Sequence, residues 1–197
     1  MDIKEEICLV MKLLYERGLI PSLGGNVSSK VGNYLWITPS SKFKANLTPE
    51  DLVKLSLDGK IIQGSKPSRE WRMHVAIYRS RVDIYSIVHA HNPLTVGLYS
   101  SQGLEGMIME FLKGLTKVSI VPELPAGSKE LASAVAEASK EADLIILRGH
   151  GIVSLGKSPL EALNKVEVLE MASLSALTSS IAKAMSWIHR LMGWGKG

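Results

Sequence analysis

Strand and helix signals alternate along this chain of 197 residues, and that alternation limits the possible folds more than any other feature. Short apolar runs rich in β-branched residues predict buried strands, and the segments between them carry apolar residues at helical spacing. Between residues 52 and 63, two strand signals flank the turn Asp58-Gly59 and predict a hairpin. We therefore predict an α/β fold in a single domain, residues 1–197, with a mixed sheet covered by helices on both faces.

Most of the expected helices begin at recognisable cap residues, such as Asp2, Ser68, Ser128 and Ser158. Helices are expected at residues 2–17, 68–80, from 92 onward, 106–114, 128–141 and 158–181. Strands are expected at residues 34–38, 52–57, 60–63, 84–91, 117–121, 143–147 and 152–155. Residues 187–197 carry two tryptophans, and we expect this apolar tail to cover a neighbouring subunit.

The composition argues against several classes of protein. A net charge of +4 favours anionic ligands such as phosphate esters, but it is too diffuse to indicate nucleic-acid binding. Cys8 is the only cysteine, so no intrachain disulfide can form. The first residues are charged, unlike a signal peptide, and no apolar stretch reaches the roughly 18 to 20 residues of a membrane span. We expect a soluble, cytoplasmic protein.

Three histidines are candidate metal ligands. His89 and His91 end the apolar run 84–88, and side chains at positions i and i+2 of a strand point to the same face. His150 lies between two glycines, where the backbone can approach a ligand closely. Three neutral imidazoles with an open fourth position are typical of catalytic zinc. Taken without His150, the pair is more simply explained as two structural histidines, and His150 makes the metal site an equally good explanation.

Two glutamates are candidates for acid–base chemistry. Glu70 falls in the first turn of the expected helix 68–80, where it could serve as general base, as metal ligand, or only as a capping carboxylate. His74, one turn later, is interpreted as a structural residue that orients Glu70. Glu110 lies in an apolar helical segment, so it either faces solvent or reaches a polar cavity, with Lys113 as a possible partner.

Three turns rich in glycine and hydroxyl groups could together hold a phosphate. The segment Gly24-Gly25-Asn26, with Ser28 and Ser29, has the composition of an anion-binding nest. The other two turns are residues 38–41 and 67–68. Each of them taken singly is more simply explained as an ordinary turn. The chain has neither a P-loop motif nor a dinucleotide-binding glycine motif.

These motifs, in this order, resemble those of the class II aldolase/adducin family. They lie within residues 24–151 and comprise Gly25-Asn26-Val27-Ser28, Ile37-Thr38-Pro39-Ser40, Pro67-Ser68 with Glu70 and His74, Val88-His89-Ala90-His91, and Leu147-Arg148-Gly149-His150-Gly151. The long last helix also fits. Within the family, the motifs are most similar to those of the aldolases that act on L-fuculose 1-phosphate.

The resemblance implies a three-layer αβα fold with a central mixed sheet, and a homotetramer with fourfold symmetry whose active sites lie at subunit interfaces. It implies one Zn²⁺ per subunit, bound by His89, His91 and His150. It also implies a set of residues that hold the substrate phosphate: Gly25, Asn26, Ser40, Ser41 and Ser68. Glu70 matches the catalytic acid/base of the family.

The implied reaction is the reversible cleavage of a phosphorylated ketose to dihydroxyacetone phosphate and an aldehyde such as lactaldehyde. Zinc supplies Lewis-acid stabilisation of the enediolate, and Glu70 moves the proton. Arg69 stands where the fuculose enzymes have a second phosphate-binding serine, and an arginine can still bind phosphate bidentately. The segment 103–113 and the short tail lack the tyrosines that the fuculose enzymes use.

Two alternatives remain at this point. The segment around Glu110 resembles the part of methylthioribulose-1-phosphate dehydratase that carries its acid/base glutamate, so a dehydratase-like lyase is the second candidate. A non-catalytic, adducin-like interaction module is the third. The complete histidine triad favours an enzyme, because a scaffold has no need of three convergent imidazoles.

Overall fold

The computed structural model describes residues 1–100 and 117–192. Its centre is an eight-stranded sheet in the order β4-β3-β2-β1-β5-β8-β7-β6. Of these neighbouring pairs only β6–β7 is parallel, so the sheet is mixed as predicted. The strands are β1 (Asn26–Val31), β2 (Tyr34–Ile37), β3 (Val53–Ser56), β4 (Ile61–Gln63), β5 (Ser86–Ala90), β6 (Val118–Val121), β7 (Leu144–Leu147) and β8 (Gly151–Gly156).

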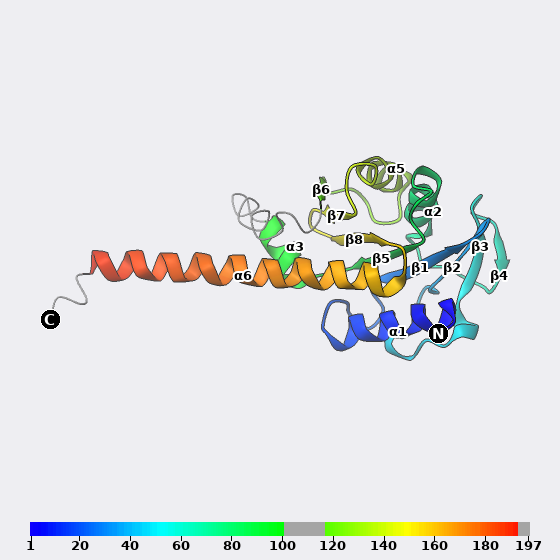
Figure 1. The fold of residues 1–197 in the computed structure, drawn as a ribbon, viewed down its shortest axis with the longest axis horizontal. Helices are drawn as coiled ribbons and strands as arrows, with labels where there is room; N and C mark the ends of the chain where they lie inside the picture. Colours follow the sequence, from blue (N-terminus) through cyan, green and yellow to red (C-terminus); the bar gives the residue numbers. More distant parts are fainter. Residues whose placement is uncertain (101–116, 193–197) are drawn as a thin grey trace.

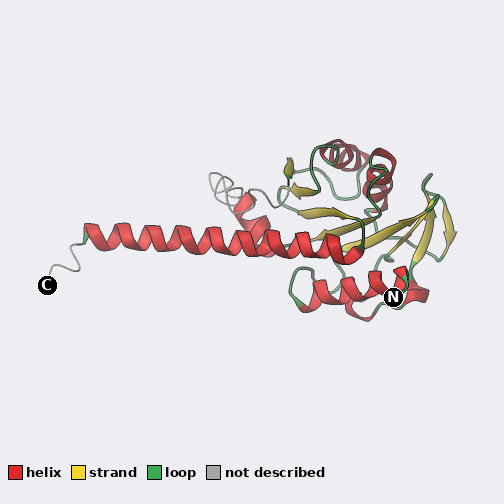
Figure 2. Ribbon diagram, viewed as in Figure 1, coloured by secondary structure: helices red, strands yellow, loops and turns green. Residues whose placement is uncertain are grey.

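Helices cover both faces of this sheet, which gives three layers (Figures 1 and 2). The helices are α1 (Ile3–Glu16), α2 (Trp71–Ser80), α3 (Pro93–Ser100), α5 (Lys129–Ala138) and α6 (Pro159–Leu191), with short 3₁₀ turns η1 (Lys44–Asn46) and η2 (Pro49–Asp51). One core packs α1, α3 and α6 on one face, and the other packs α2 and α5 on the opposite face. Successive side chains of a strand point to opposite faces of the sheet, so adjacent residues belong to different cores. In β7, for example, Ile146 lies in the first core and Ile145 in the second.

Strand β1 is the main error of the sequence prediction. The sequence predicts a glycine-rich turn for its first residues, yet β1 lies near the middle of the sheet, between β2 and β5. Ser28 and Ser29 are buried there and point to other side chains: Ser28 Oγ lies 2.9 Å from Tyr78 Oη, and Ser29 Oγ lies 2.8 Å from Ser86 Oγ. The two serines are therefore not part of an anion-binding nest.

Two further boundaries differ from expectation. Helix α2 begins at Trp71, and Ser68 accepts a hydrogen bond from the Glu70 backbone N–H instead of capping the helix directly. Helix α6 continues to Leu191, beyond the predicted residue 181, and Figure 1 shows its second half extending away from the rest of the molecule. The expected helix 106–114, with Glu110 and Lys113, lies outside the described residues. Within those residues, no helix is both long and apolar enough to cross a membrane.

Candidate active site

The three predicted metal ligands meet at the end of two adjacent strands. His89 lies in β5, His91 follows its last residue, and His150 immediately precedes β8, which pairs with β5. Each imidazole offers one ring nitrogen, and these three nitrogens all lie within 4.8 Å of one another. The Nε2 atoms of His89 and His91 face each other at 3.1 Å, as their two-residue spacing in a strand predicts.

The hydrogen bonding and electrostatics of these imidazoles bear on metal binding. His89 Nδ1 donates a hydrogen bond to the carbonyl oxygen of Ile152 at 2.8 Å, which directs the lone pair of Nε2 into the site. Burial and the neighbouring imidazoles lower the pKa of His91 to about 3, and burial also lowers the pKa of His150. Burial alone would lower the pKa of His89 too, but the Glu70 carboxylate outweighs it and raises that pKa, so a metal would displace a proton from His89 when it binds. A divalent cation fits this set, because neutral imidazoles at fixed orientation are the ligands that zinc prefers.

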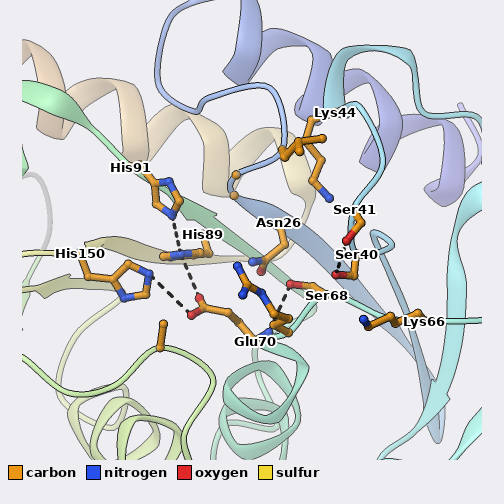
Figure 3. A pocket seen from close by; sticks show the side chains of 15 residues that line it. Asn26, Ser40, Ser41, Lys44, Lys66, Ser68, Glu70, His89, His91 and His150 are labelled. Atoms are coloured by element: carbon orange, nitrogen blue, oxygen red, sulfur yellow. Dashed lines mark hydrogen bonds and ion pairs between the residues drawn. The ribbon is translucent and has the colours of Figure 1, made fainter.

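Glu70 points directly at these histidines (Figure 3). Its Oε2 lies 3.0 Å from His89 Nε2, and its Oε1 lies 3.6 Å from His150 Nε2. The side chain makes no capping hydrogen bond to α2, so the capping interpretation is wrong. Burial alone would raise the pKa of Glu70, but the imidazoles of His89, His150 and His74 outweigh burial and lower it to about 2. The carboxylate is therefore ionised, next to the place where a metal would bind.

His74 does not orient Glu70, contrary to the sequence interpretation. It is fully buried, with its Nε2 in a hydrogen bond to Asn26 Oδ1 and its Nδ1 2.7 Å from Ser28 Oγ. Burial lowers the pKa of His74 to about 3, so the ring is neutral: Nε2 donates to the amide oxygen of Asn26, and Nδ1 accepts from Ser28. The histidine thus fixes the amide of Asn26, whose NH₂ group remains for a ligand.

The predicted phosphate-binding residues line the same cavity as the histidines. This cavity has a volume of about 410 Å³, and its wall includes the five residues of that set together with Arg69: Gly25, Asn26, Ser40, Ser41, Ser68 and Arg69. Asn26 is the cross-strand neighbour of His89 in the β1–β5 register, which links the polar end of the cavity to the histidine end. The structure thus brings these six residues together with the three histidines and Glu70, whereas Ser28 and Ser29, which the sequence also assigned to the nest, lie outside this cavity.

Backbone pairing joins the two hydroxyl-rich turns, which are far apart in the sequence. The Ser40 N–H donates to the Lys66 carbonyl, and the Ser68 N–H donates to the Thr38 carbonyl, both at 3.0 Å. Ser41 has φ 58°, the only positive φ of a non-glycine residue in the described part of the chain. Such a conformation costs on the order of 1 kcal/mol and is commonly retained at functional sites.

Sequence reasoning missed two cations of this cavity, Lys44 and Lys66. Lys66 is exposed, as lysines usually are, whereas Lys44 is only 1% exposed, with its Nζ 2.5 Å from the Pro39 carbonyl oxygen. Burial lowers the pKa of Lys44 to about 8 from an ordinary value of 10.5. Nothing in the sequence around residue 44 marks this lysine as buried.

The depressed pKa of Lys44 predicts a specific pH dependence of stability. Between pH 8 and 10.5 the unfolded chain binds more protons at this residue than the folded chain does, so its contribution to the free energy of unfolding rises with pH. We expect wild type to gain about 2 kcal/mol relative to Lys44→Met between pH 7.5 and 10. Urea denaturation of both proteins across this pH range measures the difference. Titration of the Cys8 thiol affects the free energy of unfolding of both proteins equally, so it cancels in the difference. Parallel pH profiles would contradict it.

Comparisons with known proteins agree on one family. The model of the class II aldolase and adducin N-terminal domain matches residues 5–177. An L-fuculose phosphate aldolase of Methanocaldococcus jannaschii is 35% identical over 181 residues, 91% of this chain and 98% of that protein. A 3-oxo-tetronate 4-phosphate decarboxylase of Escherichia coli is 32% identical over 177 residues, 86% of this chain and 83% of that protein. The crystal structure of L-fuculose-1-phosphate aldolase from Thermus thermophilus matches with a TM-score of 0.80 and 30% identity, covering 92% of this chain and 96% of that one.

Proposed function

The chain belongs to the class II aldolase and adducin family, and on that premise we propose that it is a zinc-dependent aldolase. Its proposed reaction is the reversible cleavage of a phosphorylated ketose of the L-fuculose 1-phosphate type into dihydroxyacetone phosphate and an aldehyde such as lactaldehyde. One observation carries the proposal. Three convergent imidazoles and an ionised Glu70 lie at one end of a cavity whose other end is lined by hydroxyl groups and cations.

His89, His91 and His150 are proposed to hold the metal, one Zn²⁺ per subunit. When bound, the metal would act as a Lewis acid on the substrate carbonyl. Zinc is the best match for three imidazoles, although the same ligands accept cobalt or manganese. The close approach of the chain to these rings needs glycine, since a Cβ on Gly24 would lie 2.9 Å from His91 Nδ1.

Glu70 is proposed to transfer the proton. In the direction of aldol addition, its carboxylate takes a proton from the hydroxymethyl carbon of dihydroxyacetone phosphate, and the resulting enediolate carbon attacks the aldehyde carbonyl. A carbon–carbon bond forms, the aldehyde oxygen becomes a hydroxyl by taking up a proton, and cleavage is the reverse. The carboxylate is ionised before substrate arrives, as a general base must be, and its contact with His89 places it beside the proposed metal site.

Asn26, Ser40, Ser41 and Ser68, with the backbone at Gly25, are proposed to hold the phosphate at the other end of the cavity. His74 supports this function indirectly, because it fixes the Asn26 amide with its NH₂ group available to an oxygen of the ligand. Arg69 is exposed at the same cavity and adds a bidentate donor. Since phosphorylated metabolites are retained inside cells, the proposal includes a cytoplasmic location.

A product assay separates this proposal from its alternatives. Decarboxylation of a 3-oxo-tetronate 4-phosphate also breaks a bond next to a carbonyl, so the same site could serve either reaction. The dehydratase alternative depends on Glu110, which lies outside the described residues. The zinc-loaded protein is offered L-fuculose 1-phosphate, methylthioribulose 1-phosphate and 3-oxo-tetronate 4-phosphate separately. We expect dihydroxyacetone phosphate from the first, without carbon dioxide. Turnover of none of them would indicate an adducin-like interaction module.

The proposal includes a homotetramer with fourfold symmetry and active sites at its subunit interfaces. Its support is the second half of α6, where every described residue from 181 to 192 is exposed, among them Ile181, Met185 and Ile188. These three residues share one face of the helix at spacings of four and three. Exposed apolar patches of this kind usually mark protein–protein contacts.

We predict that a double change of Ile181 and Ile188 to aspartate converts the tetramer to smaller species, because it places two charges in an apolar contact. The matched control changes Ser179 and Ser186 to aspartate, which adds the same charges at the same spacing on the opposite face of α6. Light scattering coupled to size-exclusion chromatography measures the mass. A wild-type mass of one chain at micromolar concentration, or equal dissociation of both variants, would contradict the prediction.

A further inference from the structure

Lys44 is buried in the wall of the cavity at the polar end. The N–H of Lys44 donates to the Ser22 carbonyl at 3.0 Å, which anchors the start of η1, and its side chain runs inward with its Nζ against the Pro39 carbonyl. Figure 3 shows the ammonium group pointing toward the hydroxyl groups of Ser40 and Ser41. These hydroxyls belong to the turn that the proposed function assigns to phosphate binding.

This ammonium group has no countercharge among the described residues. None of the ion pairs there includes Lys44. Lys42, two residues earlier, is the opposite case, because its side chain is 55% exposed and pairs with Asp51. An isolated buried charge is costly to the fold, since one carbonyl oxygen cannot replace the water that a cation loses.

We infer that Lys44 is the buried countercharge for the phosphate group of the substrate, and that it makes the site select phosphorylated over unphosphorylated ligands. The inference rests on the proposed function and adds a residue to it. A phosphate dianion beside Ser40 and Ser41 would complete the missing ion pair. The reduced pKa of Lys44 fits this picture, because a neighbouring anion would favour the charged form that burial disfavours.

Lys66 and Arg69 line the same cavity, but their proposed role differs from that of Lys44. Both are exposed, so water already stabilises their charges, and they contribute mainly to attraction of the anion into the cavity. Lys44 loses its water on folding, and its interaction with an anion takes place away from solvent. A charge-assisted contact in such surroundings is stronger than the same contact at the surface.

A purely structural role for Lys44 is the competing explanation, in which the ammonium only holds the Pro39 carbonyl and with it the turn 39–41. The two explanations differ in what they predict for ligands. Loss of a structural support would lower the affinity for every ligand of the cavity. Loss of a countercharge would lower the affinity for phosphorylated ligands only, and would leave the affinity for a neutral ligand at the histidine end unchanged.

The test uses the full-length, zinc-loaded protein and calorimetric titration with inorganic phosphate, dihydroxyacetone phosphate and unphosphorylated dihydroxyacetone. We expect Lys44→Met to weaken both phosphate-containing ligands roughly 10- to 100-fold and to leave the affinity for dihydroxyacetone within about twofold. The control Lys42→Met removes an exposed lysine nearby and is expected to leave all three affinities unchanged. Lys44→Gln provides a second neutral variant if Lys44→Met folds poorly by circular dichroism.

Unchanged phosphate affinity in both neutral variants would overturn the inference, as would equal weakening of phosphorylated and unphosphorylated ligands. Inorganic phosphate probes the anion end without any assumption about the reaction. If wild type binds phosphate through Lys44 but cleaves no ketose phosphate, the proposed aldolase activity fails while the countercharge role stands. If wild type cleaves the ketose phosphate and the variants do so with unchanged KM, the countercharge role fails while the activity stands.

Discussion

His89→Ala is expected to abolish metal binding and to lower kcat/KM for ketose phosphate cleavage by about 10⁴-fold or more. The ring is central to the site, since its Nε2 lies 3.1 Å from His91 Nε2 and 3.0 Å from the Glu70 carboxylate. Removal of one of three ligands leaves too few imidazoles to retain zinc, and Lewis-acid stabilisation contributes several kcal/mol to such reactions. Metal analysis of the purified variant and steady-state kinetics measure both effects.

The control for this experiment is His189→Ala, in the extended part of α6. It removes the same side chain from a residue outside the cavity, so the metal content should remain at the wild-type value, and kcat/KM is compared once light scattering shows that assembly through α6 is unchanged. Circular dichroism must show that the His89 variant is folded. A folded His89→Ala protein that retains one zinc per chain and full activity would show that the triad is not the metal site.

Glu70→Gln is expected to lower kcat by about 10²- to 10⁴-fold while zinc remains bound. Glutamine keeps the shape of the side chain but cannot accept the proton from carbon. Because the three histidines are unchanged, the metal content should stay at one per chain, which separates this variant from His89→Ala. Activity of Glu70→Gln at the wild-type level would disprove the assigned role and make Glu110 the candidate for proton transfer.

Much of the fold and the site could be predicted because the relevant signals are local. The His89-Ala90-His91 spacing needs only the two-residue period of a strand, and the β-branched runs around it indicate a buried sheet. The alternation of elements predicted the three layers, and the sheet is mixed as the hairpin signal at Asp58-Gly59 indicated. Residues in the glycine- and hydroxyl-rich turns were correctly predicted to lie together.

The features that were missed depend on contacts between distant segments. The buried positions of strand β1 include Ser28 and Ser29, whose hydroxyl groups form hydrogen bonds, beside the apolar Val27, so the strand carries no hydrophobic alternation. His74 lies four residues after its supposed partner Glu70, but its actual partner Asn26 is 48 residues away in the sequence. In the sequence, Lys44 cannot be distinguished from a surface lysine, because its burial depends on the packing of η1 against the turn 39–41. Polar residues buried by tertiary contacts have no local signature.

The central claim is that Glu70, beside a metal held by the three histidines, removes a proton from the carbon next to the carbonyl of dihydroxyacetone phosphate. The most direct measurement is deuterium exchange at that carbon, followed by NMR in D₂O without any aldehyde, because it does not depend on which ketose is the natural substrate. The account predicts that the zinc-loaded protein exchanges one of the two hydroxymethyl hydrogens, and that chelation or Glu70→Gln reduces the exchange to the buffer rate. Exchange at the buffer rate with the zinc-loaded wild type would contradict the account.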